Sequence, residues 1–325
     1  MLGVEVNHGG PSTVSSNVEL LARWLVNSLF NDYDVASDFV FVFVAATVGA
    51  ARGTYEVRLL KTQLVALDID GTLIPPGADH RAVPDPAITS AVAALVAAGI
   101  VVVLASGRMY PGTARVARHL GLVSPLICQQ GASVHRADGS VAHRFAIDPD
   151  IARELVLFAQ QEGWPFAWFD AERYLASHPN EPSAEFGRVS DVEPEYRIDA
   201  HKVGVIPTGV DIISTTTHAN RIHRELDARY GDRVHLLDFS SVTAAHAPEA
   251  SKGNALALLA QDLGIAQQEV LALGDSVNDV SMLRWAGRGI AMPHGDHHAR
   301  AAADEILGGT GVSGVAPLLW SLLRS

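Results

Sequence analysis

Short apolar runs rich in Val, Leu and Ile alternate with amphipathic helical patterns from residue 62 onwards. This alternation is typical of a parallel β-sheet flanked by helices, because each parallel strand needs a crossover before the next. The pattern predicts strands at residues 64–68, 100–105, 126–128, 270–273 and 289–292. Apolar residues at three-to-four spacing predict helices at residues 86–98, 251–263 and 277–286. We therefore expect an α/β fold with a Rossmann-like parallel sheet as its core.

The pattern changes between the third and fourth of these strands, over residues 147–246. Here the sequence predicts helices at residues 151–163 and 218–230, strands at 165–169 and 202–207, and two further strands near Val234 and Val242. We interpret this block as an α+β cap domain inserted into a core formed by residues 62–146 and 247–325.

Residues 1–61 form an N-terminal extension of uncertain meaning. Its apolar run at residues 39–51 is shorter than the ~20 residues that span a bilayer, and no basic segment precedes it as in a signal peptide. The letters FVFVFV favour a strand. A second hypothesis is that the native protein starts near Val57, because a complete domain begins directly afterwards.

Composition excludes several classes of protein. Apolar residues make up 48% of the chain and charged residues 18%, which is typical of a globular protein. The net charge of −12 and the lack of a Lys/Arg cluster argue against a nucleic-acid partner, and the short apolar run argues against a membrane partner. Cys128 is the single cysteine, so no internal disulfide can form, which fits a reducing, cytoplasmic setting.

Acidic residues stand where two of the predicted strands end. Asp68 and Asp70 lie in LVALDIDGTLI, and LALGDSVNDVSML carries Asp275, Asn278 and Asp279. Two carboxylates ~4 Å apart repel by about 1 to 4 kcal/mol, so their clustering indicates a bound cation or a shared proton, and an oxygen-rich set suits Mg²⁺. The alternatives are a turn-forming Asp pair and a helix capped by Asp275 or Ser276.

Two further segments add anion-binding chemistry. VVVLASGR ends in Ser106, Gly107 and Arg108, a hydroxyl and backbone N–H groups at a helix start that could cradle an anion or form an ordinary turn. EASKGNAL carries Lys252 at the start of another helix. Only three of the 24 basic residues are Lys, so a lysine here hints that a compact point charge is needed.

These four segments, in this order, resemble the haloacid dehalogenase superfamily, in its Cof-type sugar-phosphatase branch with a large cap between the second and third motifs. The resemblance implies a magnesium-dependent phosphatase that hydrolyses small phosphate monoesters through an aspartyl-phosphate. It implies Asp68 as the nucleophile and Asp70 as the acid/base.

The same resemblance implies the ligands of the metal and of the phosphate. Mg²⁺ would be held by Asp68, the backbone carbonyl of Asp70, and Asp275, with Asp279 in or near the shell. The phosphate would contact the backbone at Ile69, together with Ser106, Gly107, Lys252 and Asn278. The family pattern leads one to expect Asn where Gln130 stands, which puts cap or substrate contacts in question.

Other interpretations remain open at this point. A phosphomutase, a catalytically silent phosphate-binding member and a receiver module that switches on an Asp are the alternatives. The string Asp296, His297, His298 is similar to manganese phosphoesterases, but it suits a helix start or loop better. We expect surface positions, or core positions with satisfied hydrogen bonds, for the isolated histidines His201, His218, His223 and His246. We expect cap-core positions for Trp164, Trp168 and Tyr174, one of which could face the cleft. The substrate beyond a small phosphorylated metabolite, and the oligomeric state, are not set by the sequence.

Overall fold

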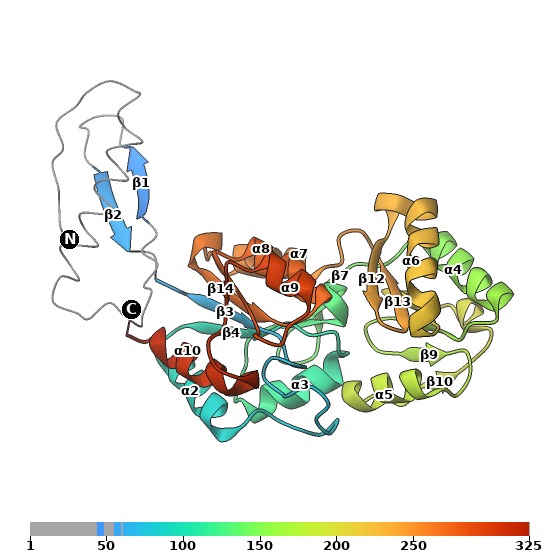
Figure 1. Ribbon diagram of the computed structural model, residues 1–325, viewed down its shortest axis with the longest axis horizontal. Coiled ribbons are helices and arrows are strands. Elements are labelled where there is room, and N and C mark those ends of the chain that lie inside the picture. Colours follow the sequence, from blue (N-terminus) through green and yellow to red (C-terminus); the bar gives the residue numbers. More distant parts are fainter. Residues whose placement is uncertain (1–43, 49–54, 60, 325) are drawn as a thin grey trace. The chain divides into compact units, whose positions relative to one another are not determined.

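The computed structural model describes residues 44–48, 55–59 and 61–324 (Figure 1). The chain divides into two compact units, residues 1–61 and 62–325. In the first unit, β1 (Val44–Val48) pairs antiparallel with β2 (Tyr55–Leu59). The strand predicted from FVFVFV lies outside the described residues except for Val44, where β1 begins.

A five-stranded parallel sheet forms the centre of the second unit, with strand order β16-β15-β14-β3-β4. Its middle strands are β14 (Val270–Gly274), β3 (Leu64–Leu67) and β4 (Val101–Leu104), and β15 (Arg288–Ala291) and β16 (Glu305–Ile306) complete it. β14 and β3 are buried on both faces, which explains their continuous apolar sequence. The predicted α/β, Rossmann-like fold is therefore confirmed.

Helices cover both faces of this sheet. Val65 and Leu67 pack against α2 (Pro86–Ala97), α3 (Tyr110–His119) and α10 (Val315–Ser321). Leu64 and Ala66 point the other way, against α7 (Lys252–Asp262) and α8 (Val280–Trp285). The predicted helix at residues 277–286 is divided, because the 3₁₀ turn η5 (Val277–Asp279) precedes α8.

The strand predicted at residues 126–128 belongs only marginally to the parallel sheet. β5 (Leu126–Cys128) touches β4 through one parallel bridge between Ala105 and Ile127, and then pairs antiparallel with β6 (Ser133–His135), which pairs with β7 (Val141–Arg144). The chain reverses between β5 and β6 through the turn η1 (Gln129–Gly131), whose three residues all have positive φ. This reversal sends the chain toward the cap instead of into another crossover.

The inserted segment forms a six-stranded sheet of order β10-β9-β8-β11-β13-β12. Its helices α4 (Pro149–Glu162) and α6 (Thr216–Tyr230) pack on one face, where they bury Phe166 and Trp168. The strands are β8 (Phe166–Phe169), β9 (Tyr174–Ala176), β10 (Glu195–Tyr196), β11 (Gly209–Ile213), β12 (His235–Phe239) and β13 (Val242–His246). Helix α5 (Glu181–Ser190) lies beside α3 (Figure 1), and the Ser190 hydroxyl accepts the Met109 N–H at 3.1 Å.

The strand predicted at residues 202–207 is wrong. A short 3₁₀ turn ends at Lys202, Gly204 has a φ of +80°, and Pro207 has no N–H to donate to a ladder. The strand is instead β11, which begins two residues later and whose apolar pattern is interrupted by Asp211. The sequence shows no clear pattern for the shorter or more polar elements α3, α5, β6, β7, β9, β10 and β16, and for α9 (His297–Ala302) it predicts only a helix start or loop.

Candidate active site

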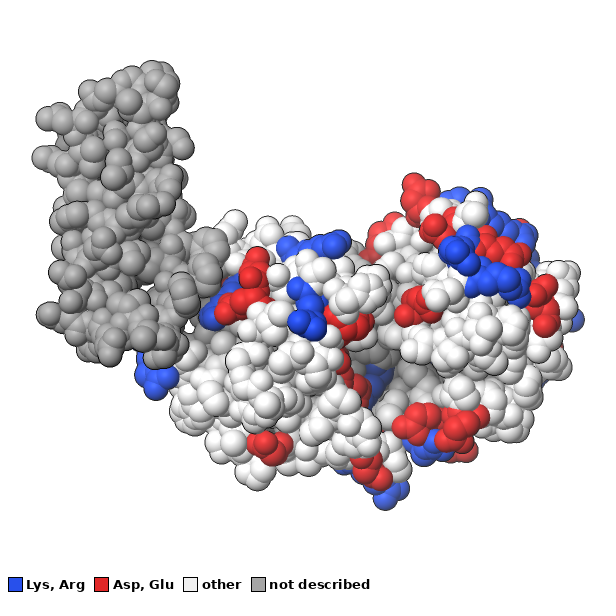
Figure 2. Space-filling view, in the orientation of Figure 1, with Lys and Arg blue, Asp and Glu red and all other residues white. Residues whose placement is uncertain are grey.

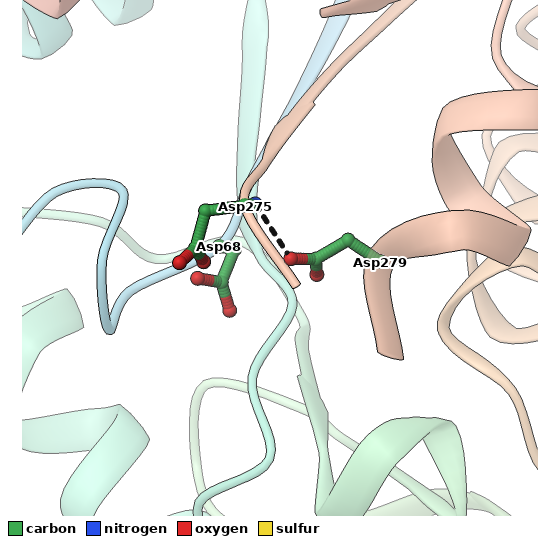
Figure 3. Close-up of side chains that lie close together, drawn as sticks. All are labelled: Asp68, Asp275 and Asp279. Atoms are coloured by element: carbon green, nitrogen blue, oxygen red, sulfur yellow. Dashed lines mark hydrogen bonds between the residues drawn. The ribbon is translucent and has the colours of Figure 1, made fainter. Parts of the chain in front are cut away.

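The carboxyl ends of β3, β4 and β14 meet at one edge of the parallel sheet, where open α/β folds bind ligands. Asp68 directly follows β3 and Asp275 directly follows β14. Figure 3 shows Asp68, Asp275 and Asp279 converging, and one oxygen of each lies within 4.8 Å of the others. The structure thus brings together three carboxylates from two segments about 200 residues apart in the chain.

Lys252 supplies the positive charge of this cluster. Its fully buried Nζ donates to Asp68 Oδ1 at 2.7 Å and to Asp279 Oδ1 at 2.6 Å. Burial alone lowers the pKa of Lys252, but the charges of Asp279 and Asp68 outweigh it and hold that pKa above its ordinary value. Lys252 is therefore a permanent cation between two carboxylates.

A glycine in the turn η1 fixes where Lys252 starts its helix. Gly131 has a φ of +94°, and a Cβ there would lie 2.2 Å from the carbonyl carbon of Ser251. The turn therefore packs directly against the backbone at the start of α7, where Ser251 caps the helix by accepting the Asn254 N–H at 3.1 Å. A larger residue at position 131 would displace Lys252 from the carboxylates.

Asp279 has both carboxylate oxygens engaged. Oδ1 accepts from Lys252, and Oδ2 accepts the backbone N–H groups of Asp275 at 2.8 Å and Ser276 at 3.0 Å. The side chain is fully buried. Asp279 thus fixes the loop after β14 and holds Lys252, so of the three acids it has the fewest lone pairs free for a metal.

Asp275 is the carboxylate with an oxygen still free to bind a metal ion. Its Oδ1 is buried and has no hydrogen-bond partner among the described residues. Burial and the charge of Asp279 raise its pKa to about 7, and burial and Asp279 likewise raise the pKa of Asp68 although Lys252 opposes them. The cluster therefore holds more negative charge than one ammonium group neutralises, and its all-oxygen donors fit a divalent cation such as Mg²⁺.

The turn after β3 leaves room for Asp275. Gly71 has a φ of +89°, and a Cβ at that position would lie 2.2 Å from Asp275 Oδ2. Only glycine adopts this conformation at little cost and lets a carboxylate approach so closely.

Asp70 points toward Arg108 instead of toward the other acids. Nε of Arg108 donates to Asp70 Oδ2 at 2.8 Å and Nη2 donates to Oδ1 at 2.5 Å, a bidentate ion pair. The Arg108 side chain is only 3% exposed, and its Nη1 is buried with no partner in the described part of the chain. From the sequence, only the hydroxyl and backbone groups of this segment were predicted to act, and the guanidinium group of Arg108 was missed. The pattern that could have revealed it is an Arg directly after Ser-Gly at the end of a strand.

The remaining predicted phosphate contacts surround the same point. The buried Ser106 hydroxyl accepts the Arg108 N–H at 3.2 Å, and Ile69 is buried in the turn between Asp68 and Asp70. Asn278 Nδ2 donates to Gln130 Oε1 at 2.6 Å. A Cβ at Gly107 would lie 2.4 Å from Gln130 Nε2, so the residue that departs from the family pattern touches two predicted phosphate ligands.

A cavity of about 410 Å³ extends from these residues to the cap. Its floor includes Asp68, Asp70, Arg108 and Asp275, and its other walls come from the cap sheet and α5. Figure 2 shows this hollow between core and cap, with acidic and basic side chains at its bottom.

Several side predictions can now be assessed. Asp296 caps α9 by accepting the Ala299 N–H at 2.8 Å, so the Asp-His-His string starts a helix. Among the described residues the only group of three or more metal-binding side chains is Asp68, Asp275 and Asp279.

Trp168 packs in the cap core as expected and Tyr174 lines the cavity. His246 also lines the cavity with one unpartnered nitrogen, so its prediction as a surface or satisfied core position is wrong.

Known proteins resemble this chain in sequence and in fold. Residues 65–319 match the haloacid dehalogenase-like hydrolase family. The chain belongs to this family, in its Cof-type branch. It is 31% identical to an HMP-PP phosphatase from an Enterobacter species, over 71% of this chain and 84% of that protein.

A second sequence relative and a solved structure are also similar to this chain. A chloroplast protein of Arabidopsis thaliana, named endoribonuclease YBEY, is 28% identical over 81% of this chain, which spans 47% of that longer protein. The crystal structure of a HAD subclass IIB sugar phosphatase superposes with a TM-score of 0.69 at 20% identity, over 81% of this chain and all of that one (100%), which shows a shared fold. Within the described residues, the search for a helix long and apolar enough to cross a membrane found none.

The charge imbalance predicts opposite effects of Asp275→Asn with and without metal. Without metal at pH 8 the variant should melt higher than the wild type, because a neutral amide replaces a half-buried carboxylate whose Oδ1 is buried without a partner among the described residues. Saturating Mg²⁺ should raise the melting temperature of the wild type by several degrees, at roughly 2–4 °C per kcal/mol of binding free energy, and that of the variant much less.

Calorimetric melting curves with EDTA and with MgCl₂ measure this difference. Asp262→Asn, at a largely exposed carboxylate, is the matched control and should respond to Mg²⁺ like the wild type. Equal Mg²⁺ shifts in wild type and Asp275→Asn would remove Asp275 from the metal site.

Proposed function

We propose that this chain is a magnesium-dependent phosphatase that hydrolyses small phosphate monoesters through an aspartyl-phosphate on Asp68. The observation that carries the proposal is the buried Asp68 carboxylate, held by Lys252 beside Asp275 at the floor of the cavity between core and cap. The proposal includes the division into core residues 62–146 and 247–325 with cap residues 147–246, and a cytoplasmic setting consistent with the single cysteine.

The metal site in this proposal consists of the carboxylates of Asp68 and Asp275 and the backbone carbonyl of Asp70. Asp279 lies behind them, since its oxygens are already engaged. Bound Mg²⁺ would supply the positive charge that lets a carboxylate approach an anionic phosphate. Lys252 supplies the chain's own share of this charge.

Asp68 acts as the nucleophile. Its Oδ1 is held by Lys252, so Oδ2 is the oxygen that forms a bond to phosphorus while the ester P–O bond breaks. The hydroxyl of Ser106, the backbone N–H groups of Ile69 and Gly107, the amide of Asn278 and the ammonium of Lys252 donate hydrogen bonds to the phosphoryl oxygens as charge develops there.

Asp70 acts as the acid and then the base. It gives a proton to the departing ester oxygen, and later takes one from the water that attacks phospho-Asp68 to release inorganic phosphate. Both carboxylate oxygens of Asp70 accept hydrogen bonds from Arg108, so Asp70 has to turn away from Arg108 before it can contact the departing ester oxygen. An incoming phosphate competes for the Arg108 guanidinium, whose Nη1 is unpartnered, and thereby frees Asp70 as the substrate arrives.

The first test of this mechanism is Asp68→Asn. An amide cannot form the acyl-phosphate intermediate, so phosphate release should fall below about one hundredth of the wild-type rate, at least ~2.7 kcal/mol of barrier. Inorganic phosphate is measured over a panel of phosphorylated metabolites with Mg²⁺ and with EDTA. The exposed Asp150→Asn is the matched control and should keep full activity. Substantial turnover by Asp68→Asn would refute Asp68 as the nucleophile. Isomerisation of a phosphorylated metabolite, with its phosphoryl group moved to another hydroxyl group and no phosphate released, would indicate a phosphomutase.

The role of Asp70 is tested by the leaving group. Asp70→Asn should slow an alkyl phosphate strongly, because an alkoxide needs a proton, and slow the phosphorylation step with p-nitrophenyl phosphate much less. The second step still needs a base, so p-nitrophenol should appear as a burst while phospho-Asp68 accumulates. Rapid-quench kinetics measure both. Equal losses on the two substrates without a burst would mean that Asp70 acts through the metal site alone.

A further inference from the structure

The face of the cap sheet that looks onto the cavity has an unusual composition. Side chains alternate along each strand, so Val210 and Ile212 of β11 pack on the cap helices while Asp211 and Ile213 line the cavity. The same alternation on β13 directs Ala245 into the cap core and Val242, Ala244 and His246 to the cavity.

Asp211 lies in a hollow at the centre of this face. Its register partners are Ala167 on β8 and Ala244 on β13, whose methyl groups leave the carboxyl group room on both sides. The side chain is nine-tenths buried and Oδ1 has no hydrogen-bond partner among the described residues. Burial raises its pKa to about 7. A buried acid without a partner costs stability, so packing gives no reason for it.

His246 provides a second free acceptor on the neighbouring strand. Its Nδ1 donates to the Thr208 carbonyl at 3.0 Å, and burial lowers its pKa to about 4, so the ring is neutral at pH 7 with the lone pair on Nε2. Nε2 is buried and has no partner in the described residues. Gly209 stands between the rings of Phe169 and His246, where a Cβ would lie 2.6 Å and 2.8 Å from them, so the lack of a side chain keeps both rings at the surface of the cavity.

Aromatic rings form the adjoining wall. Tyr174 and Phe186 lie 4.8 Å apart between ring centroids, and Phe169 lies 5.9 Å from Tyr174 and 6.0 Å from Phe186. Among the described residues, those that the cap contributes to the cavity wall include Asp211 and Glu185 but no Lys or Arg. This wall therefore offers apolar aromatic surface and hydrogen-bond acceptors, and no cation for a second anionic group.

Resting on the phosphatase function above, we propose that the cap selects a phosphate ester whose leaving group is a planar heteroaromatic ring bearing N–H donors. The ring packs on Phe169, Tyr174 and Phe186 and donates its N–H groups to Asp211 and His246. A sugar would leave most of its hydroxyl groups facing apolar walls, and a bisphosphate would bring its second anion to acidic ones. Both are therefore poor substrates.

Three esters of one size test this selection in the full chain with Mg²⁺. They are (2-aminopyridin-4-yl)methyl phosphate, pyridin-4-ylmethyl phosphate without the amino donor, and benzyl phosphate. We expect kcat/KM for the amino ester to exceed that for benzyl phosphate at least tenfold, and glucose 6-phosphate and fructose 1,6-bisphosphate to be poorer than either.

The variant Asp211→Ala then tests the Asp211 carboxyl group as the hydrogen-bond acceptor. It should lower kcat/KM for the amino ester at least tenfold and change that for benzyl phosphate less than twofold, without lowering the melting temperature. Asp238→Ala is the matched control, since Asp238 pairs with Thr243 on β12 and β13 and faces away from the cavity, and it should leave both values unchanged.

The outcomes separate the two proposals. Turnover of benzyl and p-nitrophenyl phosphate with no advantage for the amino ester, or equal loss on all esters in Asp211→Ala, overturns the proposed selection and leaves the phosphatase function standing. No hydrolysis of any ester, p-nitrophenyl phosphate included, overturns both.

Discussion

The ammonium group of Lys252, buried between Asp68 and Asp279, is the interaction on which the rest of the site depends. It joins Asp68, at the end of β3, to the loop after β14 and to the start of α7. Removing either partner would leave a buried charge uncompensated, which is far more costly than losing a surface ion pair. The close packing of Gly131 against the start of α7 is needed because this ammonium group tolerates little displacement.

The same cluster stores unfavourable electrostatic energy that function can use. Three carboxylates face one ammonium group, and the raised pKa values of Asp68 and Asp275 reflect the cost of keeping them ionised together. Asp211 in the cap also has a raised pKa, in its case because of burial alone. Stable proteins usually avoid such groups, and their presence at both ends of one cavity indicates that a cation at one end and a hydrogen-bond donor at the other complete them.

The division of labour between core and cap follows from how each is built. The core presents its polar groups from strand ends and helix starts, where backbone geometry fixes them and side chains are few. The cap presents a sheet face, where every second residue of each strand is free to vary without disturbing the helices on the opposite face. In the proposed mechanism the core therefore carries the reaction chemistry and the cap selects the leaving group.

The sequence by itself determined the parallel sheet, the inserted cap and the segments that carry the site, because fully buried strands and their acidic ends are local patterns. It failed at residues 202–207, where an apolar run contained Gly204 and Pro207, and at β11, where Asp211 broke the pattern of a true strand. Only the tertiary structure decided that Asp70 pairs with Arg108 and that Asp211 and His246 share a cavity. Those contacts join residues far apart in the chain. The spacing of residues within one segment does not specify which face of a strand or which part of a loop will contact a distant segment.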